Sequence, residues 1–137
     1  MQDFPTIQGR KIRTAIVGCG RISKNHFDAI EQHSNNLELI AVMDVDDNVL
    51  AQYKKQYKVN AYLNLNQMLD NEELDLVCLC TPSGFHADQT VVCASYGVHI
   101  MTEKPMATGW DDGLRMVKAC DDAHVRLFVV KQNRKNS

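Results

Sequence analysis

Short runs of apolar, often β-branched residues alternate along this 137-residue chain with longer stretches whose apolar positions recur at helical spacing. The strand-like runs occupy residues 14–17, 37–43, 74–80, 98–102 and 125–130. A brief run at residues 61–63, between two helical stretches, predicts one further short strand. This alternation is typical of a parallel sheet with helices on both faces, so we expect a single α/β domain, doubly wound, over residues 1–137.

Polar residues and a glycine mark the expected ends of the helices. Candidate N-caps precede four helical stretches, at Asp46, Asn64, Ser83 and Thr108. Thr108 is followed three residues later by Asp111, which makes a capping pair. Gly97 follows a helical stretch, and we expect it to end that helix.

The first strand-like run leads into two closely spaced glycines and then into a helical pattern. Gly18 can take a tight turn, and Gly20 has no side chain to keep the backbone from a pyrophosphate. The N–H groups at the start of the following helix would face the same anion. The third small residue of this fingerprint is Ser23 rather than glycine or alanine. The pattern predicts a dinucleotide-binding turn of the Rossmann type, and the alternative is a glycine-rich turn without a ligand.

A carboxylate ends the second strand, at the spacing from the glycines that is typical of a ribose-binding residue. Asp44 can accept hydrogen bonds from the adenosine ribose hydroxyls, and Asp46 and Asp47 follow it closely. A 2′-phosphate would meet this negative cluster with no arginine or lysine nearby, so the pattern favours NAD over NADP. The alternative is that Asp44 only begins the turn while Asp46 caps the next helix.

Residues that follow the later strands are candidates because ligands of open parallel sheets bind beyond the carboxyl ends of the strands. Pro82 makes the exit of one run rigid, and a helix is expected to begin near Ser83. His86 lies in the first turn of that helix, where it either contacts the cofactor or substrate or is simply exposed. Lys104, in a Glu-Lys-Pro segment, could orient a nicotinamide and polarise a substrate hydroxyl, or be a surface lysine in a turn.

Composition argues against several other classes of protein. The formal net charge of −2 and the pI of about 6.2 give no overall attraction to nucleic acid. The start lacks an apolar core of signal-peptide length, and no segment approaches the ~20 apolar residues of a membrane span, so we expect a cytoplasmic protein with no membrane partner.

The cysteines and histidines indicate neither disulfides nor a metal site. The five cysteines are an odd number, and Cys78 and Cys80 alternate along a strand like small apolar residues, so we expect reduced thiols. The five histidines show no zinc-like spacing with one another or with cysteines, and we expect no bound metal.

The segments AIVGCGRISKNH, VMDVD, CTPSGFH and TEKP, in this order and spacing, resemble the N-terminal cofactor domain of the Gfo/Idh/MocA oxidoreductases. The resemblance covers nearly the whole chain. It implies NAD(P)-dependent oxidation or reduction of a sugar or polyol carbon, with Lys104 as the catalytic residue between nicotinamide and substrate. The cofactor contacts that it implies are Gly18, Gly20, Arg21 and Asp44 on the pyrophosphate and adenosine side, Thr81, Pro82 and His86 at the nicotinamide half, and Ile22 and Glu103 as further contacts.

The end of the chain, VVKQNRKN, is similar to a branch of this family that oxidises UDP-N-acetylglucosaminuronic acid at C3 for bacterial surface-polysaccharide (lipopolysaccharide) synthesis. The alternative for such a polar, basic end is a frayed terminus. The resemblance therefore implies a sugar or nucleotide-sugar substrate.

Family members continue into a second domain, which supplies the substrate pocket, the oligomer interface and usually an acid/base histidine. We expect that domain to lie outside these 137 residues, the fragment to hold NAD without turnover, and the full-length protein to form a homo-oligomer. A non-catalytic NAD-binding sensor or regulatory module is the alternative function, because the same fold serves regulators. A methyltransferase that binds S-adenosylmethionine is a third, which the glycine pair and the Glu-Lys-Pro segment disfavour.

Overall fold

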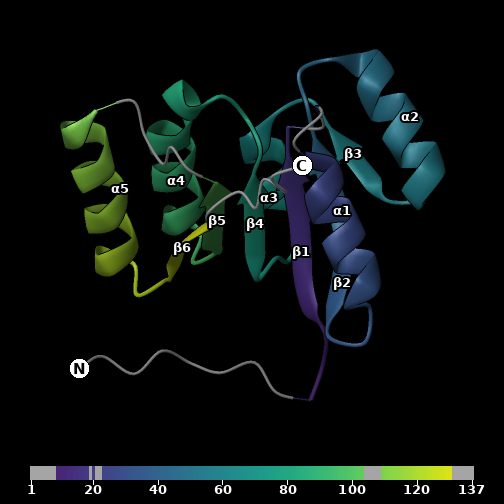
Figure 1. Ribbon diagram of the computed structural model, residues 1–137, viewed down its shortest axis with the longest axis horizontal. Helices are drawn as coiled ribbons and strands as arrows, with labels where there is room; N and C mark the ends of the chain where they lie inside the picture. The colour runs from purple at the N-terminus through teal and green to yellow at the C-terminus, as the bar shows by residue number, and fades with distance from the viewer. Residues whose placement is uncertain (1–8, 19, 21–22, 104–108, 131–137) are drawn as a thin grey trace, which may run out of the picture.

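Six parallel strands form one sheet in the computed structural model, which describes residues 9–18, 20, 23–103 and 109–130. The order across the sheet is β3-β2-β1-β4-β5-β6, so the winding direction reverses between β1 and β4. The strands of the sheet are β1 (Ile12–Val17), β2 (Leu37–Met43), β3 (Asn60–Tyr62), β4 (Leu76–Leu79), β5 (His99–Glu103) and β6 (Leu127–Val130). This topology confirms the doubly wound, Rossmann-type α/β domain (Figure 1).

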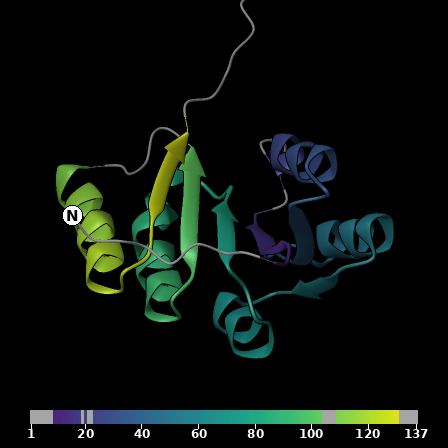
Figure 2. The ribbon, with the colours of Figure 1, turned by 90° about the horizontal axis from the view of Figure 1, so that it is seen from below.

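Helices cover both faces of the sheet, as the alternating pattern predicts. The helices are α1 (Ser23–Gln32), α2 (Asp47–Tyr57), α3 (Leu65–Asn71), the 3-10 turn η1 (Ser83–Phe85), α4 (His86–Ser95) and α5 (Trp110–Asp122). Helices α1 and α2 pack on one face over β1 to β3, whereas α3, α4 and α5 pack on the other (Figure 2).

Two apolar clusters, one on each face, make up the core. Alternate residues of β1 serve different clusters: Ala15 and Val17 pack with α3, α4 and α5, while Ile16 packs with Phe27 and Ile30 of α1. Strand β1 is therefore buried on both faces, which explains its unbroken apolar run.

The observed element ends confirm most of the predicted caps. The Asp46 carboxylate accepts from the N–H groups of Asn48 and Val49, and the Asn64 side chain caps α3. Gly97 follows α4 with a φ of +75°, as expected of a glycine that ends a helix.

The prediction that Ser83 is an N-cap is wrong. Ser83 begins the 3-10 turn η1, and α4 starts three residues later after Phe85, without a side-chain cap. Pro82 precedes the turn and sets this tighter path. Thr108 lies outside the described residues, and Gly109 occupies the N-cap position of α5.

Two strands are shorter than their apolar runs. Leu74 and Val125 belong to the core but lie in the connections before β4 and β6. Apolar residues are also buried outside the strands, so the apolar runs extend beyond the hydrogen-bonded ladders.

The described cysteines lie within or at the ends of core elements. None of Cys78, Cys80, Cys93 and Cys120 forms a disulfide, as predicted. Burial raises the pKa of the Cys78 and Cys93 thiols to about 12, so both are protonated at neutral pH.

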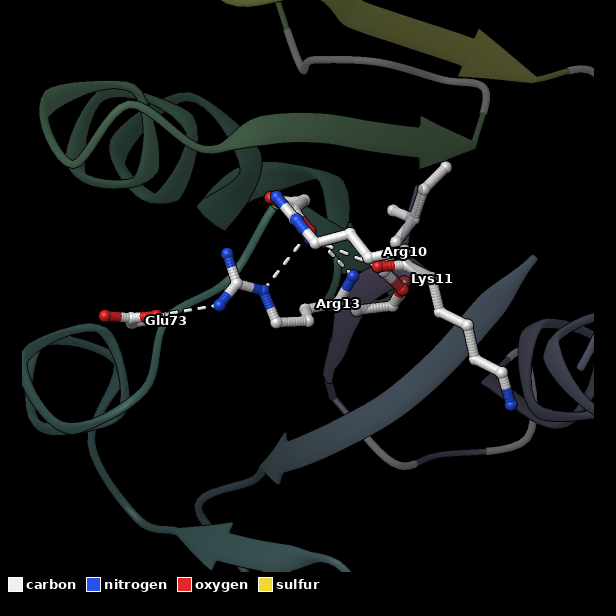
Figure 3. Close-up of polar contacts among 7 residues, drawn as sticks. Arg10, Lys11, Arg13 and Glu73 are labelled. Carbon is white, nitrogen blue, oxygen red and sulfur yellow. Dashed lines mark hydrogen bonds and ion pairs between the residues drawn. The ribbon is translucent and has the colours of Figure 1, made fainter. Parts of the chain in front are cut away.

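The amino edge of the sheet is closed by ion pairs between the start of β1 and the connection before β4 (Figure 3). Arg10 donates two hydrogen bonds to the Asp75 carboxylate at 2.6 and 2.9 Å, and the backbone N–H of Arg13 donates a third at 2.8 Å. Arg13 also reaches Glu73 at 2.7 Å. The hydrogen bond from Arg10 is the largest cause that holds the pKa of Asp75 far below its usual range.

Candidate functional site

A cleft of ≈ 300 Å³ opens at the carboxyl edge of the sheet, beside the point where the strand order reverses. Its lining residues end or follow β1, β2 and β4 or belong to η1 and α4: Gly18, Gly20, Met43, Asp44, Val45, Cys80, Thr81, Pro82, Phe85 and Gln89. Five of the predicted site residues, Gly18, Gly20, Asp44, Thr81 and Pro82, therefore come together in this cleft.

Gly18 has the backbone conformation that the predicted turn requires. Its φ is +87°, and a Cβ on it would lie 3.0 Å from backbone atoms of Cys80 and Thr81. Its N–H donates to the carbonyl of Met43 at 2.7 Å, which ties the turn to the end of β2. A side chain at this position would push β1 away from the chain that leaves β4.

Gly20 differs from Gly18 because open space surrounds it. A Cβ on Gly20 would meet no atom within 4 Å, so the protein itself does not require a glycine here. Gly20 lines the cleft, where a missing side chain leaves its backbone accessible to a ligand. The two glycines thus have separate reasons to be present, one in the fold and one in the cleft.

Ser23 replaces the third small residue of the fingerprint without loss of packing. It is fully buried at the start of α1. Its hydroxyl donates to the carbonyl of Gly20 at 2.5 Å, and its N–H reaches the same oxygen at 3.1 Å. The first turn of α1 contains no acidic residue that would repel an anion at the helix start. This start and the exposed glycine backbone fit a pyrophosphate.

Asp44 begins the turn after β2 and also lines the cleft, and its contact with a ribose stays a prediction. The Oδ1 atom of Asp44 accepts the N–H of Asp46 at 2.9 Å to form the turn. Asp46 in turn caps α2. The carboxylate is thus held at the cleft by its own turn, in a position suited to ribose hydroxyls.

The chain after β4 is held by side chains of α4. The Thr81 hydroxyl donates to Oε1 of Gln89 at 2.6 Å, and Nε2 of His86 donates to the Thr81 carbonyl at 2.7 Å. His86 is 4% exposed, so the alternative of a simply exposed residue is wrong. A contact of His86 with a cofactor stays a prediction.

Sequence reasoning missed the other five lining residues, which are Met43, Val45, Cys80, Phe85 and Gln89. Gln89 lies one helical turn beyond His86, so helical spacing could have placed it on the same face. Val45 is 83% exposed beside Asp44, and the sequence carries no signal for it, because that exposure is visible only in the structure.

A polar contact between α1 and β5 also lies at the carboxyl edge, between two residues that do not line the cleft. Nε2 of His26, in α1, lies 3.0 Å from Oε1 of Glu103, the last residue of β5. The two side chains are 10% and 13% exposed. Sequence reasoning named Glu103 but not His26, because 77 residues separate the partners.

Three predicted site residues, Arg21, Ile22 and Lys104, lie outside the described residues. In the described ranges, no three His, Cys, Asp or Glu side chains gather as a metal site would need. Among the helices of the same ranges, none has the length and apolarity to span a membrane.

Residues 12–131 match the family described as oxidoreductases with an NAD-binding Rossmann fold, GFO_IDH_MocA. Among solved structures, the chain is similar to the WlbA dehydrogenase of Chromobacterium violaceum in complex with NADH and UDP-GlcNAcA, with 51% identity over 99% of this chain and a TM-score of 0.93. The WlbA dehydrogenase of Bordetella pertussis, in complex with the same two ligands, is 50% identical over 93% of the chain, with a TM-score of 0.89.

A curated relative, the D-apiose dehydrogenase of Paraburkholderia graminis, is 31% identical over 121 residues, which cover 88% of this chain. The chain spans 39% of each WlbA structure and 32% of the apiose enzyme. The similarity thus extends over nearly all of this sequence but over less than half of each relative.

Proposed function

Since the chain belongs to the GFO_IDH_MocA oxidoreductase family, whose NAD-binding Rossmann domain it comprises, we propose that it binds NAD for a dehydrogenase. The proposed reaction transfers hydride between the nicotinamide and a carbon of a sugar or polyol. The single observation that carries the proposal is the cleft at the carboxyl edge, where the Gly18 turn, the bare Gly20 backbone and Asp44 meet.

Each part of the cleft suits one part of the dinucleotide. Gly20 and the start of α1 would hold the pyrophosphate through backbone N–H groups, together with Arg21 and Ile22. Asp44 would accept from the adenosine ribose hydroxyls, and its charge disfavours a 2′-phosphate. Thr81 and Pro82 would border the nicotinamide half, with His86 and Glu103 nearby in the proposed site.

UDP-N-acetylglucosaminuronic acid, oxidised at C3, is the substrate that we propose. The support is the 50–51% identity to two dehydrogenases whose structures hold this nucleotide sugar, against 31% to the apiose enzyme. The product would serve surface-polysaccharide synthesis in the cytoplasm. A second domain, outside residues 1–137, would complete the substrate pocket and a homo-oligomeric enzyme.

Bound NAD⁺ supplies the hydride acceptor at nicotinamide C4. A base from the second domain would remove the proton of the substrate hydroxyl. Lys104 would stabilise the negative charge that develops on that oxygen, because a cation held beside a forming oxyanion lowers the barrier. Replacing Lys104 by alanine in a longer, active protein should therefore lower kcat by about 100-fold and leave the NADH affinity nearly unchanged.

Calorimetric titration of the folded chain tests the cofactor assignment. We expect NADH to bind at least about tenfold more tightly than NADPH, and S-adenosylmethionine to give no heat. Tighter binding of NADPH would contradict the role of Asp44. Absence of any NADH heat or shift in Tm, in a sample with a native circular dichroism spectrum, would overturn the proposal. Turnover of UDP-N-acetylglucosaminuronic acid by the longer protein separates an enzyme from a sensor.

A further inference from the structure

We propose that His26 is a positioning residue, which acts through Glu103 on the chain segment that carries Lys104. This inference rests on the proposed function. It assigns a task to a contact between the helix after the glycine turn and the end of β5, two elements that the sequence gives no reason to connect.

The pair spans the carboxyl edge of the sheet. Strand β5 is separated from β1 by β4, yet α1 follows β1 directly. Met101 packs against the cluster that contains Phe27 of α1. Glu103 lies two residues beyond Met101 and therefore projects from the same face of β5, toward α1. The alternation of side chains along β5 thus places the Glu103 carboxylate beside His26.

The contact is directional and little exposed. An ionised carboxylate only accepts hydrogen bonds, so Nε2 of His26 carries the donated proton. At 10% and 13% exposure the two groups are poorly solvated, and loss of either partner leaves the other without its hydrogen bond in a site with little water. The pair therefore holds the Glu103 side chain in one orientation.

Glu103 is held through its backbone as well. It is the last residue of β5 and pairs with Val130 of β6 in the parallel ladder. The backbone of Glu103 is therefore held by β6 and its side chain by His26, and these two contacts fix the end of β5. Lys104 lies outside the described residues and is the next residue in the sequence, so a single peptide bond joins it to this anchored position. The Oε1 atom of Glu103 thus accepts a hydrogen bond within the protein.

The variants that test this inference are His26→Ala, His26→Asn, His26→Gln and Glu103→Ala, in the longer protein that contains the second domain. Glutamine can extend its amide N–H toward Glu103, whereas asparagine is one methylene shorter. His33→Ala removes an exposed histidine just after the same helix and is the matched control. The measurements are kcat with UDP-N-acetylglucosaminuronic acid, the Kd for NADH, the emission of bound NADH and Tm.

We expect His26→Ala, His26→Asn and Glu103→Ala each to lower kcat about tenfold, with the NADH Kd changed less than about threefold. His26→Gln should recover most of kcat. The double variant His26→Ala/Glu103→Ala should lose no more than either single variant, because both remove the same contact. The emission of bound NADH, which needs no turnover, should change in His26→Ala and not in His33→Ala.

A kcat within about twofold of wild type in both His26→Asn and Glu103→Ala would overturn the inference, as would a lowered Tm with unchanged kcat. If His26→Ala does not fold, the comparison of glutamine with asparagine at this position decides. The proposed function fails separately, on the wild-type protein, if that protein binds no NADH or leaves the nucleotide sugar unchanged.

Discussion

The two edges of the sheet are formed by opposite ends of the same strands, and they are held together differently. At the amino edge, one nearly buried carboxylate, Asp75, receives hydrogen bonds from Arg10 and Arg13 (Figure 3). At the carboxyl edge, the cleft beside Gly18 and Gly20 is lined mainly by backbone, small residues and apolar side chains. Ion pairs hold the amino edge together, whereas the carboxyl edge has a cleft that can hold a ligand.

This difference separates stability from binding. The Asp75 cluster joins segments 62 residues apart, and Arg10, Arg13 and Asp75 are not among the residues that line the cleft. The cleft, in contrast, is lined by Gly20 just before the start of α1, and the N–H groups of a helix start are suited to an anion. Substitutions at the two edges should therefore change different measured quantities, with one exception at Gly18.

Gly18→Ala should have the largest effect and should change both stability and NADH binding, because Gly18 serves both the fold and the cleft. Positive φ and a Cβ 3.0 Å from the backbone of Cys80 should together lower the free energy of unfolding by about 3 kcal/mol. NADH affinity should fall as well. Urea denaturation and calorimetric titration measure the two effects. Gly20→Ala is the control: its Cβ meets open space, so stability should change by less than about 0.5 kcal/mol while NADH binding weakens.

Asp75→Ala should lower the free energy of unfolding and leave NADH binding unchanged. The change leaves Arg10 and the N–H of Arg13 without their acceptor, and because both arginines are partly exposed we expect a loss of about 2 kcal/mol. Glu73→Ala is the control, since that carboxylate is 87% exposed and should matter by less than about 0.5 kcal/mol. Weaker NADH binding by Asp75→Ala would show that the two edges are coupled.

Asp44→Asn should affect binding alone. Asparagine keeps an oxygen for the N–H of Asp46, so the turn and the free energy of unfolding should be preserved. Loss of the charge-assisted bonds to the ribose should weaken NADH binding about tenfold and reduce the preference over NADPH. An unchanged ratio of the two affinities would remove Asp44 from cofactor selection.

Acid should weaken the amino edge selectively. The pKa of Asp75 is lowered in the folded state from its ordinary value of 3.8, so its stabilisation is complete above that value and is lost as pH falls toward the folded pKa. The stability difference between wild type and Asp75→Asn should therefore shrink by about 1 kcal/mol between pH 7 and pH 3. Urea denaturation at both pH values measures it, and a constant difference would contradict the assigned cause.

Local signals predicted the parts of this protein that depend on neighbouring residues. The strand–helix alternation predicted the sheet, and the Gly18 turn and the Asp46 and Asn64 caps were recognisable from a few residues each. The prediction for Ser83 failed because Pro82 leads into a 3-10 turn before α4. His86 follows that turn and is buried, which excludes the alternative of an exposed histidine.

The amino-acid sequence alone determined which residues could turn, cap or accept a hydrogen bond, because those properties belong to one side chain and its nearest backbone. Only the tertiary structure decided which distant residues meet. His26 reaches Glu103, and Arg10 reaches Asp75, because the strand order brings their elements together. Such contacts depend on the path of the whole chain through the sheet, which no local spacing records.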